Sequence, residues 1–265
     1  MSAERPVAVV GASGKTGRAV TAALAARGVP VVPVGRAQWP RLPQVLAGVR
    51  AVSLIAPNLH ADEPTLVGEV LAAAGAAGVE RIVYHSVTAP YAPDLPHHLG
   101  KAVSEDLVRR SGLAWTILQP CAYVQNLVPA LRDPLPALVV PYDVHARFGL
   151  VDLVDVAAVT ALALHDDEHV GATYELGGLQ QVSVTEVGAE AQRLLGRPVP
   201  VSAVDPATWV SSATGLSERE RRWLLAMVEY YDRYGLPAGS LAIRALLGKL
   251  AHPLAATLAR ELGVG

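Results

Sequence analysis

The sequence has little cysteine and few aromatic residues. A single cysteine, Cys121, in 265 residues excludes an internal disulfide and any metal site built from several cysteines, and it suits a reducing compartment. Aromatic residues make up 5% of the chain, with only one Phe, so Ala, Val and Leu must fill most of the core. These deficits predict a cytoplasmic protein without a metal centre.

Charge of one sign does not accumulate along the chain. Lys and Arg number 22 and Asp and Glu number 24, which gives a formal net charge of -2. A basic stripe, the usual footprint of a nucleic-acid binder, is therefore lacking. Every apolar run ends well before the roughly 20 residues that span a bilayer. We expect a small-molecule substrate, no direct nucleic-acid partner and no membrane partner.

The first half of the chain alternates short apolar runs with Ala-rich helical stretches. This alternation is typical of βαβ units around a parallel sheet that helices cover on both faces. Helices are expected from the first glycine cluster to about residue 27, over 63–77 and over 97–111. The strands that the pattern predicts are 7–10, 29–34, 51–56, 81–86 and 115–119.

After Pro120 the chain becomes irregular and rich in proline, and α/β character then returns. A strand and a helix are expected over about 148–164, a strand over 169–176 and a helix over 185–195. Ser217 and Glu220 form a capping box that predicts the start of another helix. Aromatic residues gather in and just before that helix, where they could cap a flat substrate, pack the core of the second unit or form a dimer contact.

Three glycines follow the first strand directly. Gly11, Gly14 and Gly17 form a G-x-x-G-x-x-G pattern, in which glycines permit a tight turn and a close approach of the backbone to a pyrophosphate. The N-terminus of the following helix would supply amide donors to the phosphates. The alternative is a glycine-rich turn without a ligand. The predicted cofactor contacts of this segment are Gly11, Ser13, Gly14, Lys15, Thr16 and Gly17.

The end of the second strand selects between the two nicotinamide cofactors. An acidic residue there would bind a free ribose 2′-hydroxyl, whereas Arg36 can pair with a 2′-phosphate. The sequence therefore predicts NADP(H) rather than NAD(H). Lys15 and Arg18 would add positive potential around this phosphate, or they are solvated helix residues.

Several further motifs occur in a characteristic order. They are Val83-Tyr-His-Ser-Val87, Pro96-His-His-Leu-Gly-Lys101, Ser111 to Pro120 followed by Tyr123 and Asn126, and Val151-Asp152 with Asp155. Together with the glycine motif and Arg36, they make the chain resemble the NmrA-like NAD(P)-binding proteins, an atypical group of short-chain dehydrogenases/reductases. That group is related to isoflavone reductase-like enzymes, bacterial quinone reductases and triphenylmethane reductase.

The resemblance implies a fold and a cofactor. It implies a doubly wound parallel Rossmann sheet at residues 1–155 and a smaller, interwoven C-terminal α/β substrate domain at residues 156–265, with NADP(H) bound. Further cofactor contacts are expected at the turn formed by Ala56, Pro57 and Asn58, and at Pro120. The resemblance leaves the chemistry open, because its members include reductases and also regulators that bind the dinucleotide without turning it over.

Lys101 matches the lysine of the family, which contacts the cofactor or polarises the substrate in related reductases. The tyrosine that ordinary short-chain dehydrogenases carry four positions earlier is absent, because His97 stands there. This absence argues against classical carbonyl reduction. The alternative for Lys101 is a surface lysine paired with Glu105 one turn later.

Other candidate catalytic groups follow from position. Ser86 ends the fourth strand at the edge where doubly wound sheets present groups to ligands, while His85 should point to the other face. His98 is either a proton donor or a solvated helix residue, and Tyr91 and Tyr123 are alternative donors. We read Cys121 as a packed residue, and Asp152 with Asp155 as helix capping.

Three functions compete. The first is an NADPH-dependent reductase that transfers hydride to a small conjugated carbonyl, quinone or related acceptor. The second is a non-catalytic NADP(H)-sensing regulatory protein, for which the expected partner is another protein or a second copy in a homodimer. The third is a non-redox biosynthetic enzyme, a cyclase or isomerase, on the same fold.

Overall fold

A computed structural model describes residues 5–264 of the chain, and its first half follows the predicted order of strands and helices. Strand β1 covers exactly the predicted residues, and the other elements shift by a few positions. The elements are β1 (Val7–Val10), α1 (Lys15–Ala25), β2 (Val31–Val34), η1 (Arg36–Arg41), α2 (Leu42–Val45), β3 (Ala51–Leu54), α3 (Glu63–Ala76), β4 (Arg81–His85), α4 (Pro96–Arg109) and β5 (Ala114–Pro120).

The second half contains short strands and several helices. In chain order these are η2 (Val124–Asn126), α5 (Val128–Leu131), β6 (Leu138–Val140), α6 (Leu153–His165), η3 (Asp167–His169), β7 (Ala172–Leu176), α7 (Val184–Leu195), β8 (Val201–Ala203), α8 (Pro206–Ser212), α9 (Glu218–Tyr234), α10 (Leu241–Leu247) and α11 (Leu254–Leu262). Helix α9 begins as predicted, since Ser217 and Glu220 form both hydrogen bonds of the capping box.

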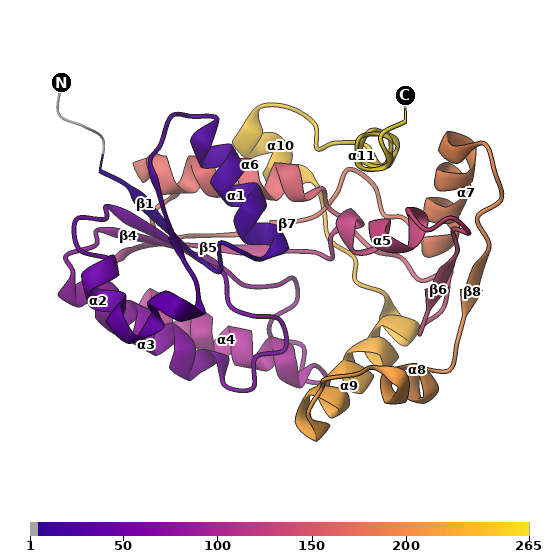
Figure 1. Ribbon diagram of the computed structural model, residues 1–265, viewed down its shortest axis with the longest axis horizontal. Coiled ribbons are helices and arrows are strands. Elements are labelled where there is room, and N and C mark those ends of the chain that lie inside the picture. Colours follow the sequence, from indigo (N-terminus) through magenta and orange to yellow (C-terminus); the bar gives the residue numbers. More distant parts are fainter. Residues whose placement is uncertain (1–4, 265) are drawn as a thin grey trace. The chain divides into compact units, whose positions relative to one another are not determined.

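The main sheet has six strands in the order β2-β1-β3-β4-β5-β7. The pairs β1–β2, β1–β3, β3–β4 and β4–β5 are parallel, with Val10 beside Val34 and Leu54, and Leu54 beside Tyr84. Helices α1 and α6 cover one face, and α2, α3 and α4 cover the other (Figure 1). The chain order reverses at β1, so the carboxyl ends of β1, β2 and β3 meet at a topological switch point, where such sheets bind ligands.

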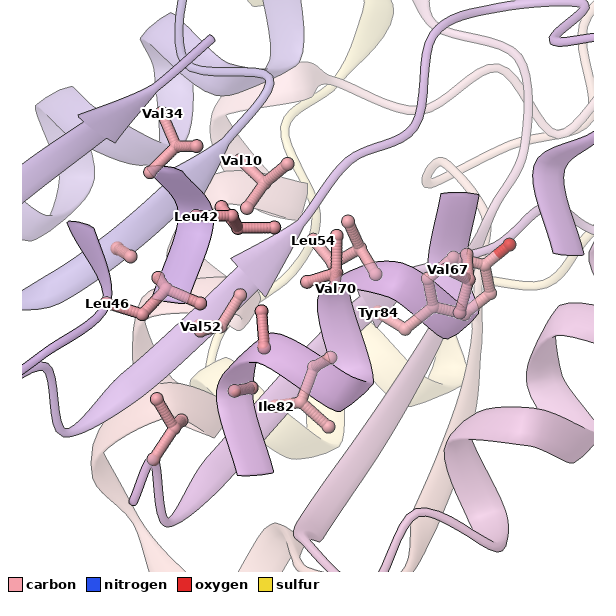
Figure 2. Close-up of a cluster of buried hydrophobic side chains, with 14 of the residues drawn as sticks. Val10, Val34, Leu42, Leu46, Val52, Leu54, Val67, Val70, Ile82 and Tyr84 are labelled. Carbon is pink, nitrogen blue, oxygen red and sulfur yellow. The ribbon is translucent and has the colours of Figure 1, made fainter. Parts of the chain in front are cut away.

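The strands are buried because both faces of the sheet are covered. All residues of β1, β3 and β4 are buried. Figure 2 shows the aliphatic cluster between the sheet and helices α2 and α3, in which Tyr84 is an aromatic member. Such continuous burial gives the apolar runs from which these strands were predicted.

The chain divides into two compact units. The first comprises the chain up to Tyr91, His98–Gln119 and Val156–Tyr174, and the second comprises Ala92–His97, Pro120–Asp155 and the chain from Glu175 onward. The second unit has its own aliphatic core, which includes Leu131, Leu138 and Leu258. The assignment of cofactor binding to one part and substrate binding to the other stays a prediction.

The predicted strand at residue 148 is absent from the described chain. Phe148 forms only isolated bridges to Val182 and Leu236, and its ring packs against Tyr142 and Tyr231. Tyr231 therefore packs within the second unit, as one of the roles expected for the clustered aromatic residues requires. Among the described helices, we find none that is long and apolar enough to cross a membrane.

Candidate functional site

The turn after β1 is built so that only glycine fits at two of its positions. Gly11 has a φ of +82°, and a Cβ there would lie 2.5 Å from the carbonyl oxygen of Ile55. A Cβ on Gly17 would overlap the Gly11 carbonyl and the Cα of Ala12. Gly14, in contrast, would meet only the Gly11 carbonyl oxygen, at 3.3 Å. Two of the three glycines are thus required by packing around the turn itself.

Helix α1 starts at this turn with its amide groups available to an anion. Gly14 is the N-cap residue, so within the described chain no side chain caps the helix, and its first turn carries no acidic residue. Ser13, Gly14 and Lys15 are exposed, and Arg18 braces the turn by donating to the Ser13 carbonyl over 2.5 Å. A helix N-terminus next to a turn with glycine at Gly11 and Gly14 fits a dinucleotide pyrophosphate.

The turns after β2 and β3 lie at the same edge of the sheet as this glycine turn. Arg36 is exposed and opens η1 directly after β2, and the preceding Gly35 amide donates to the Gln38 side chain over 2.9 Å. Ala56 is half-buried, while Pro57 and Asn58 are exposed. The predicted phosphate and ribose contacts therefore converge on the switch point, as a dinucleotide requires.

Lys101 is buried and does not pair with Glu105. Its Nζ lies 2.8 Å from Oε1 of Glu63 and donates to the His85 carbonyl over 3.4 Å. Lys101 is 8% exposed and Glu63 is 2% exposed. The alternative of a surface pair on α4 is wrong, because this face of α4 packs toward α3 and β4.

Tyr84 donates to the same Glu63 oxygen over 2.6 Å. Burial, followed by the charge of Glu63, raises the pKa of Tyr84 well above its ordinary value. The phenol is therefore neutral and serves as a hydrogen-bond donor to the carboxylate. Nothing in the local sequence signals this arrangement, since Glu63 lies 38 residues before Lys101.

Two buried histidines flank Lys101. The Nε2 atom of His85 lies 3.2 Å from the Thr160 hydroxyl on α6, so His85 does point away from the α4 face of the sheet. Burial and the Lys101 charge lower the pKa of His85 to about 3. His98 is also buried, and its Nδ1 lies 3.2 Å from the Ala89 carbonyl. Burial is the main cause that lowers the pKa of His98 to about 4, so it is neither solvated nor charged at neutral pH.

Ser86 belongs to a network centred on the buried carboxylate of Glu105. Its hydroxyl donates to Glu105 Oε1 over 2.5 Å, and Gln119 donates to the same oxygen over 2.8 Å. Tyr91 and Arg109 donate to Oε2 over 3.2 and 3.0 Å. The sequence did not single out Glu105 as a central acceptor. This network fixes the loop that leaves β4 against helix α4.

Of the remaining predicted site residues, Thr16 is half-buried in the first turn of α1, and the others belong to the second unit. Pro120 is buried at the end of β5, and Tyr123 is half-buried and forms an isolated bridge with Val151. Cys121 is buried, and burial raises the pKa of its thiol to about 12, so the prediction of a packed cysteine is confirmed. The roles of Pro120 and Tyr123 stay predictions.

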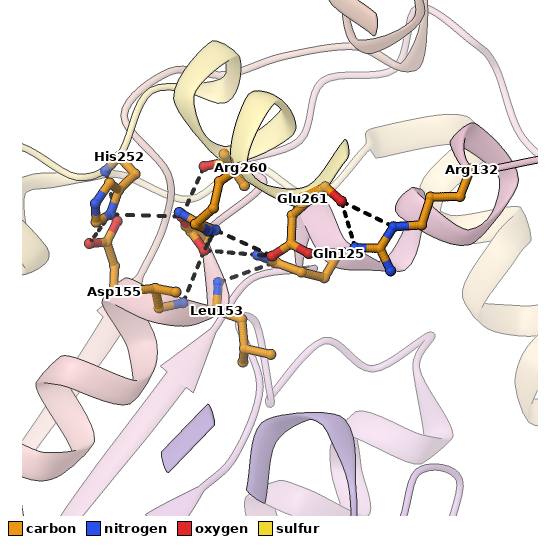
Figure 3. Close-up of polar contacts among 10 residues, drawn as sticks. Gln125, Arg132, Leu153, Asp155, His252, Arg260 and Glu261 are labelled. Atoms are coloured by element: carbon orange, nitrogen blue, oxygen red, sulfur yellow. Dashed lines mark hydrogen bonds and ion pairs between the residues drawn. The ribbon is translucent and has the colours of Figure 1, made fainter. Parts of the chain in front are cut away.

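A second polar cluster lies within this unit (Figure 3). Asp152, Asp155 and His252 place one ligand atom each within 4.8 Å of one another. Both oxygens of Asp155 accept from His252, and those of Asp152 accept from Thr257, Arg260 and other donors. Asp152 also accepts from the Val154 amide, which confirms it as a cap of α6, whereas the expected capping role of Asp155 is wrong because His252 occupies both of its oxygens. Because their oxygens are hydrogen-bonded, these carboxylates hold the C-terminal helix α11 in place.

Comparison with known proteins identifies relatives. A family model described as the NmrA-like family matches residues 39–250. An NAD(P)H azoreductase from Xenophilus azovorans is 33% identical over 203 residues, which cover 74% of this chain and 69% of the relative. The (4-alkanoyl-5-oxo-2,5-dihydrofuran-3-yl)methyl phosphate reductase of Streptomyces griseus is 32% identical over 218 residues, which cover 73% of this chain and 75% of the relative.

Solved structures show the same fold. The NADPH-dependent quinone oxidoreductase of Escherichia coli, complexed with NADPH, has a TM-score of 0.80 at 22% identity and covers 96% of this chain and 99% of its own. Citrobacter triphenylmethane reductase, complexed with NADP(H), has a TM-score of 0.79 at 22% identity, with coverage of 97% and 100%. The predicted Rossmann-type sheet is thus confirmed.

Proposed function

This chain belongs to the NmrA-like family, and we propose that it is an NADPH-dependent reductase that transfers hydride to a small conjugated carbonyl, quinone or related acceptor. The observation that carries the proposal is the glycine turn, whose shape and uncapped helix fit a pyrophosphate. The relatives named above are reductases, which agrees with the oxidoreductase predicted from the sequence.

The residues of the first unit would hold the cofactor in a definite order. The amides at Gly14 and the start of α1 would bind the pyrophosphate, Arg36 would pair with the 2′-phosphate, and the turn Ala56–Pro57–Asn58 would border the adenosine. NADPH, when bound, supplies hydride from its nicotinamide ring. Everything else required of the protein is binding, orientation and charge stabilisation.

Lys101 is the group we assign to charge stabilisation. An ammonium carries three N–H donors. Glu63 and the His85 carbonyl accept two of them, which leaves the third for an oxygen of the acceptor. Reduction of a conjugated carbonyl places negative charge on that oxygen, and a positioned cation stabilises it.

His98 does not suit the role of a charged proton donor. Its pKa is lowered to about 4, and its Nδ1 atom faces the Ala89 carbonyl. A neutral imidazole with Nδ1–H on a carbonyl presents an acceptor at its other nitrogen. We therefore propose that Lys101 stabilises the oxyanion, that Ser86 belongs to the loop that orients the site, and that Tyr123 is the remaining candidate for proton donation.

The test is NADPH oxidation with a panel of quinones, enones and azo compounds. We expect turnover with at least one class and a loss of about 100-fold or more in kcat for Lys101→Met. The matched control is Lys249→Met, since Lys249 is exposed in the second unit. Thermal unfolding of each variant checks that the fold is intact.

The second candidate function is a sensor of the NADP⁺/NADPH ratio. The specific observation in its favour is that His97 stands four positions before Lys101, where ordinary short-chain dehydrogenases carry their tyrosine. Tight NADPH binding without turnover on any acceptor of the panel would favour the sensor. Such a result would overturn the reductase proposal.

A further inference from the structure

Glu63 stands at the first position of helix α3, at the carboxyl edge of the sheet. Asp62 caps the helix by accepting from the Thr65 amide over 3.2 Å, so a separate residue does the capping. Glu63 is turned inward, where its Oε1 accepts from Tyr84 and from Lys101. A carboxylate at this position also benefits from the positive end of the helix dipole.

The ion pair between Lys101 and Glu63 contributes little to the free energy of unfolding. Both groups are almost fully buried, and taking two charges out of water costs about as much as their attraction returns. Both donors converge on Oε1, and among the described residues Oε2 of Glu63 is buried without a hydrogen-bond partner. A buried carboxylate that leaves one oxygen unsatisfied calls for an explanation other than stability.

We infer that Glu63 is the positioning residue for Lys101: it places a carboxylate oxygen 2.8 Å from the amine and fixes its direction at the end of β4, with Tyr84 fixing the carboxylate in turn. This inference rests on the proposed function for its kinetic consequence, but the protonation of Lys101 is testable without turnover. Glu63 touches neither cofactor nor acceptor in this account. It acts only through Lys101.

The groups around the ammonium define its electrostatics. Glu63 faces it from α3, and Tyr84 and His85 face it from β4. His98 and Glu105 lie on α4 itself. Both histidines are neutral at physiological pH because burial lowers their pKa values, and Glu105 is engaged by Arg109 at 3.0 Å. Glu63 is therefore the carboxylate that balances Lys101.

The chain has only three lysines, Lys15, Lys101 and Lys249, so its lysine side chains are open to direct observation. We propose NMR of the protein labelled with ¹³C at the lysine ε-carbon, assigned with Lys→Arg variants. In Glu63→Gln, the Lys101 resonance should titrate at a pH lower by about one to three units, because an opposite charge a few ångströms away has been removed. The exposed Lys249 serves as the internal reference.

Glu63→Asp provides the conservative variant. It keeps the charge but lengthens the 2.8 Å contact, so its Lys101 resonance should titrate between those of the parent and Glu63→Gln. If Glu63→Gln fails to fold, the displacement in Glu63→Asp decides the matter. Identical Lys101 titrations in the parent and in the folded variants would overturn the inference. Glu80→Gln, a surface carboxylate paired with Arg5, is the matched control.

Kinetics separate this inference from the proposed function. If the reductase proposal holds, Glu63→Gln should lower kcat about 10- to 100-fold, as expected for a misplaced group, with Glu63→Asp restoring part of it. The alkaline limb of the kcat profile should move to lower pH in Glu63→Gln. If the Lys101 titration shifts in Glu63→Gln but the parent shows no turnover, only the reductase proposal is contradicted. If the parent turns over but the Lys101 titration does not shift, only the role of Glu63 is contradicted.

Discussion

Gly17 lies so close to Gly11 that a Cβ on Gly17 would overlap the Gly11 carbonyl oxygen. The first turn of α1 is thereby packed directly onto the turn that leaves β1. The close contact places the helix N-terminus where the sheet order reverses. The packing of α1 depends on these two residues, and under the proposed function cofactor binding would depend on them too.

Gly17→Ala should weaken NADPH binding by at least about tenfold, since the overlap is with backbone atoms and the turn itself must move. Overpacking of this kind should also destabilise the fold by about 1–3 kcal/mol. A fluorescence titration with NADPH and urea unfolding measure the two effects. Gly68→Ala is the control, because a Cβ at Gly68 on α3 meets open space. Unchanged NADPH affinity in Gly17→Ala would exclude this turn as the pyrophosphate site.

Arg36→Asp should reverse the preference between the two nicotinamide cofactors. The substitution removes the cation that pairs with the 2′-phosphate and installs an acceptor for the free 2′-hydroxyl. Titrations with NADPH and NADH measure the ratio of their dissociation constants in the parent and in the variant. Arg27→Asp makes the same change of charge just past the far end of α1 and should leave the ratio unaltered. Equal loss of both affinities in Arg36→Asp would contradict the assignment.

Glu105→Gln should destabilise the first unit by about 1–3 kcal/mol, because an amide cannot accept from every donor that surrounds this buried carboxylate. Ser86→Ala removes one of those donors and should cost about 1 kcal/mol. Urea unfolding of both variants gives the difference. If Ser86→Ala proved as costly as Glu105→Gln, Glu105 would not be the centre of the network.

Asp152→Asn should make stability less sensitive to acid. Burial alone would raise the pKa of Asp152, but hydrogen bonds from Val154, Gln125 and Arg260 outweigh it and lower the pKa. A carboxyl whose pKa is depressed on folding contributes stability above its unfolded pKa, and this contribution is lost as the pH falls through the folded value. The loss is thus expected below about pH 4.

Thermal unfolding measured from neutral pH down to about pH 3 tests whether Asp152 makes the protein lose stability in acid. Over the acidic part of the range, the melting temperature of the parent should fall more steeply than that of Asp152→Asn. At neutral pH the variant should have the lower melting temperature. Asp106→Asn, in an exposed pair with Arg110, should behave like the parent. Parallel curves for the parent and Asp152→Asn would show that the pKa of Asp152 is not depressed.

The sequence predicted the elements whose signal is local. Strand β1 and the glycine turn combine an apolar run with conformations that only glycine adopts, and both were located to the residue. The three-residue strands β6 and β8 were missed, since β8 is exposed or half-buried and has no apolar alternation. Strand β6 does bury Leu138 and Val140, but three residues are too few to establish the alternation of a strand.

The site was only partly predictable for a related reason. Lys101 and Ser86 were singled out as candidates from the sequence, whereas their carboxylate partners Glu63 and Glu105 were not. A glutamate on a helix looks solvated in sequence, and its burial depends on elements distant in the chain. The alternative of a Lys101–Glu105 pair is wrong because Lys101 on α4 points toward Glu63 on α3, and tertiary packing decides that direction.

The central claim, hydride transfer from NADPH, is tested most directly by isotope transfer in a single turnover. NADPH carrying deuterium at nicotinamide C4 is mixed with the protein and a quinone or an enone, and the product is examined by mass spectrometry and NMR. With hydride transfer, deuterium from one face of C4 appears on the reduced enone carbon, and NADPH oxidation is slower when that face carries the deuterium. Saturating NADPH binding with no oxidation and no labelled product from any acceptor would contradict it.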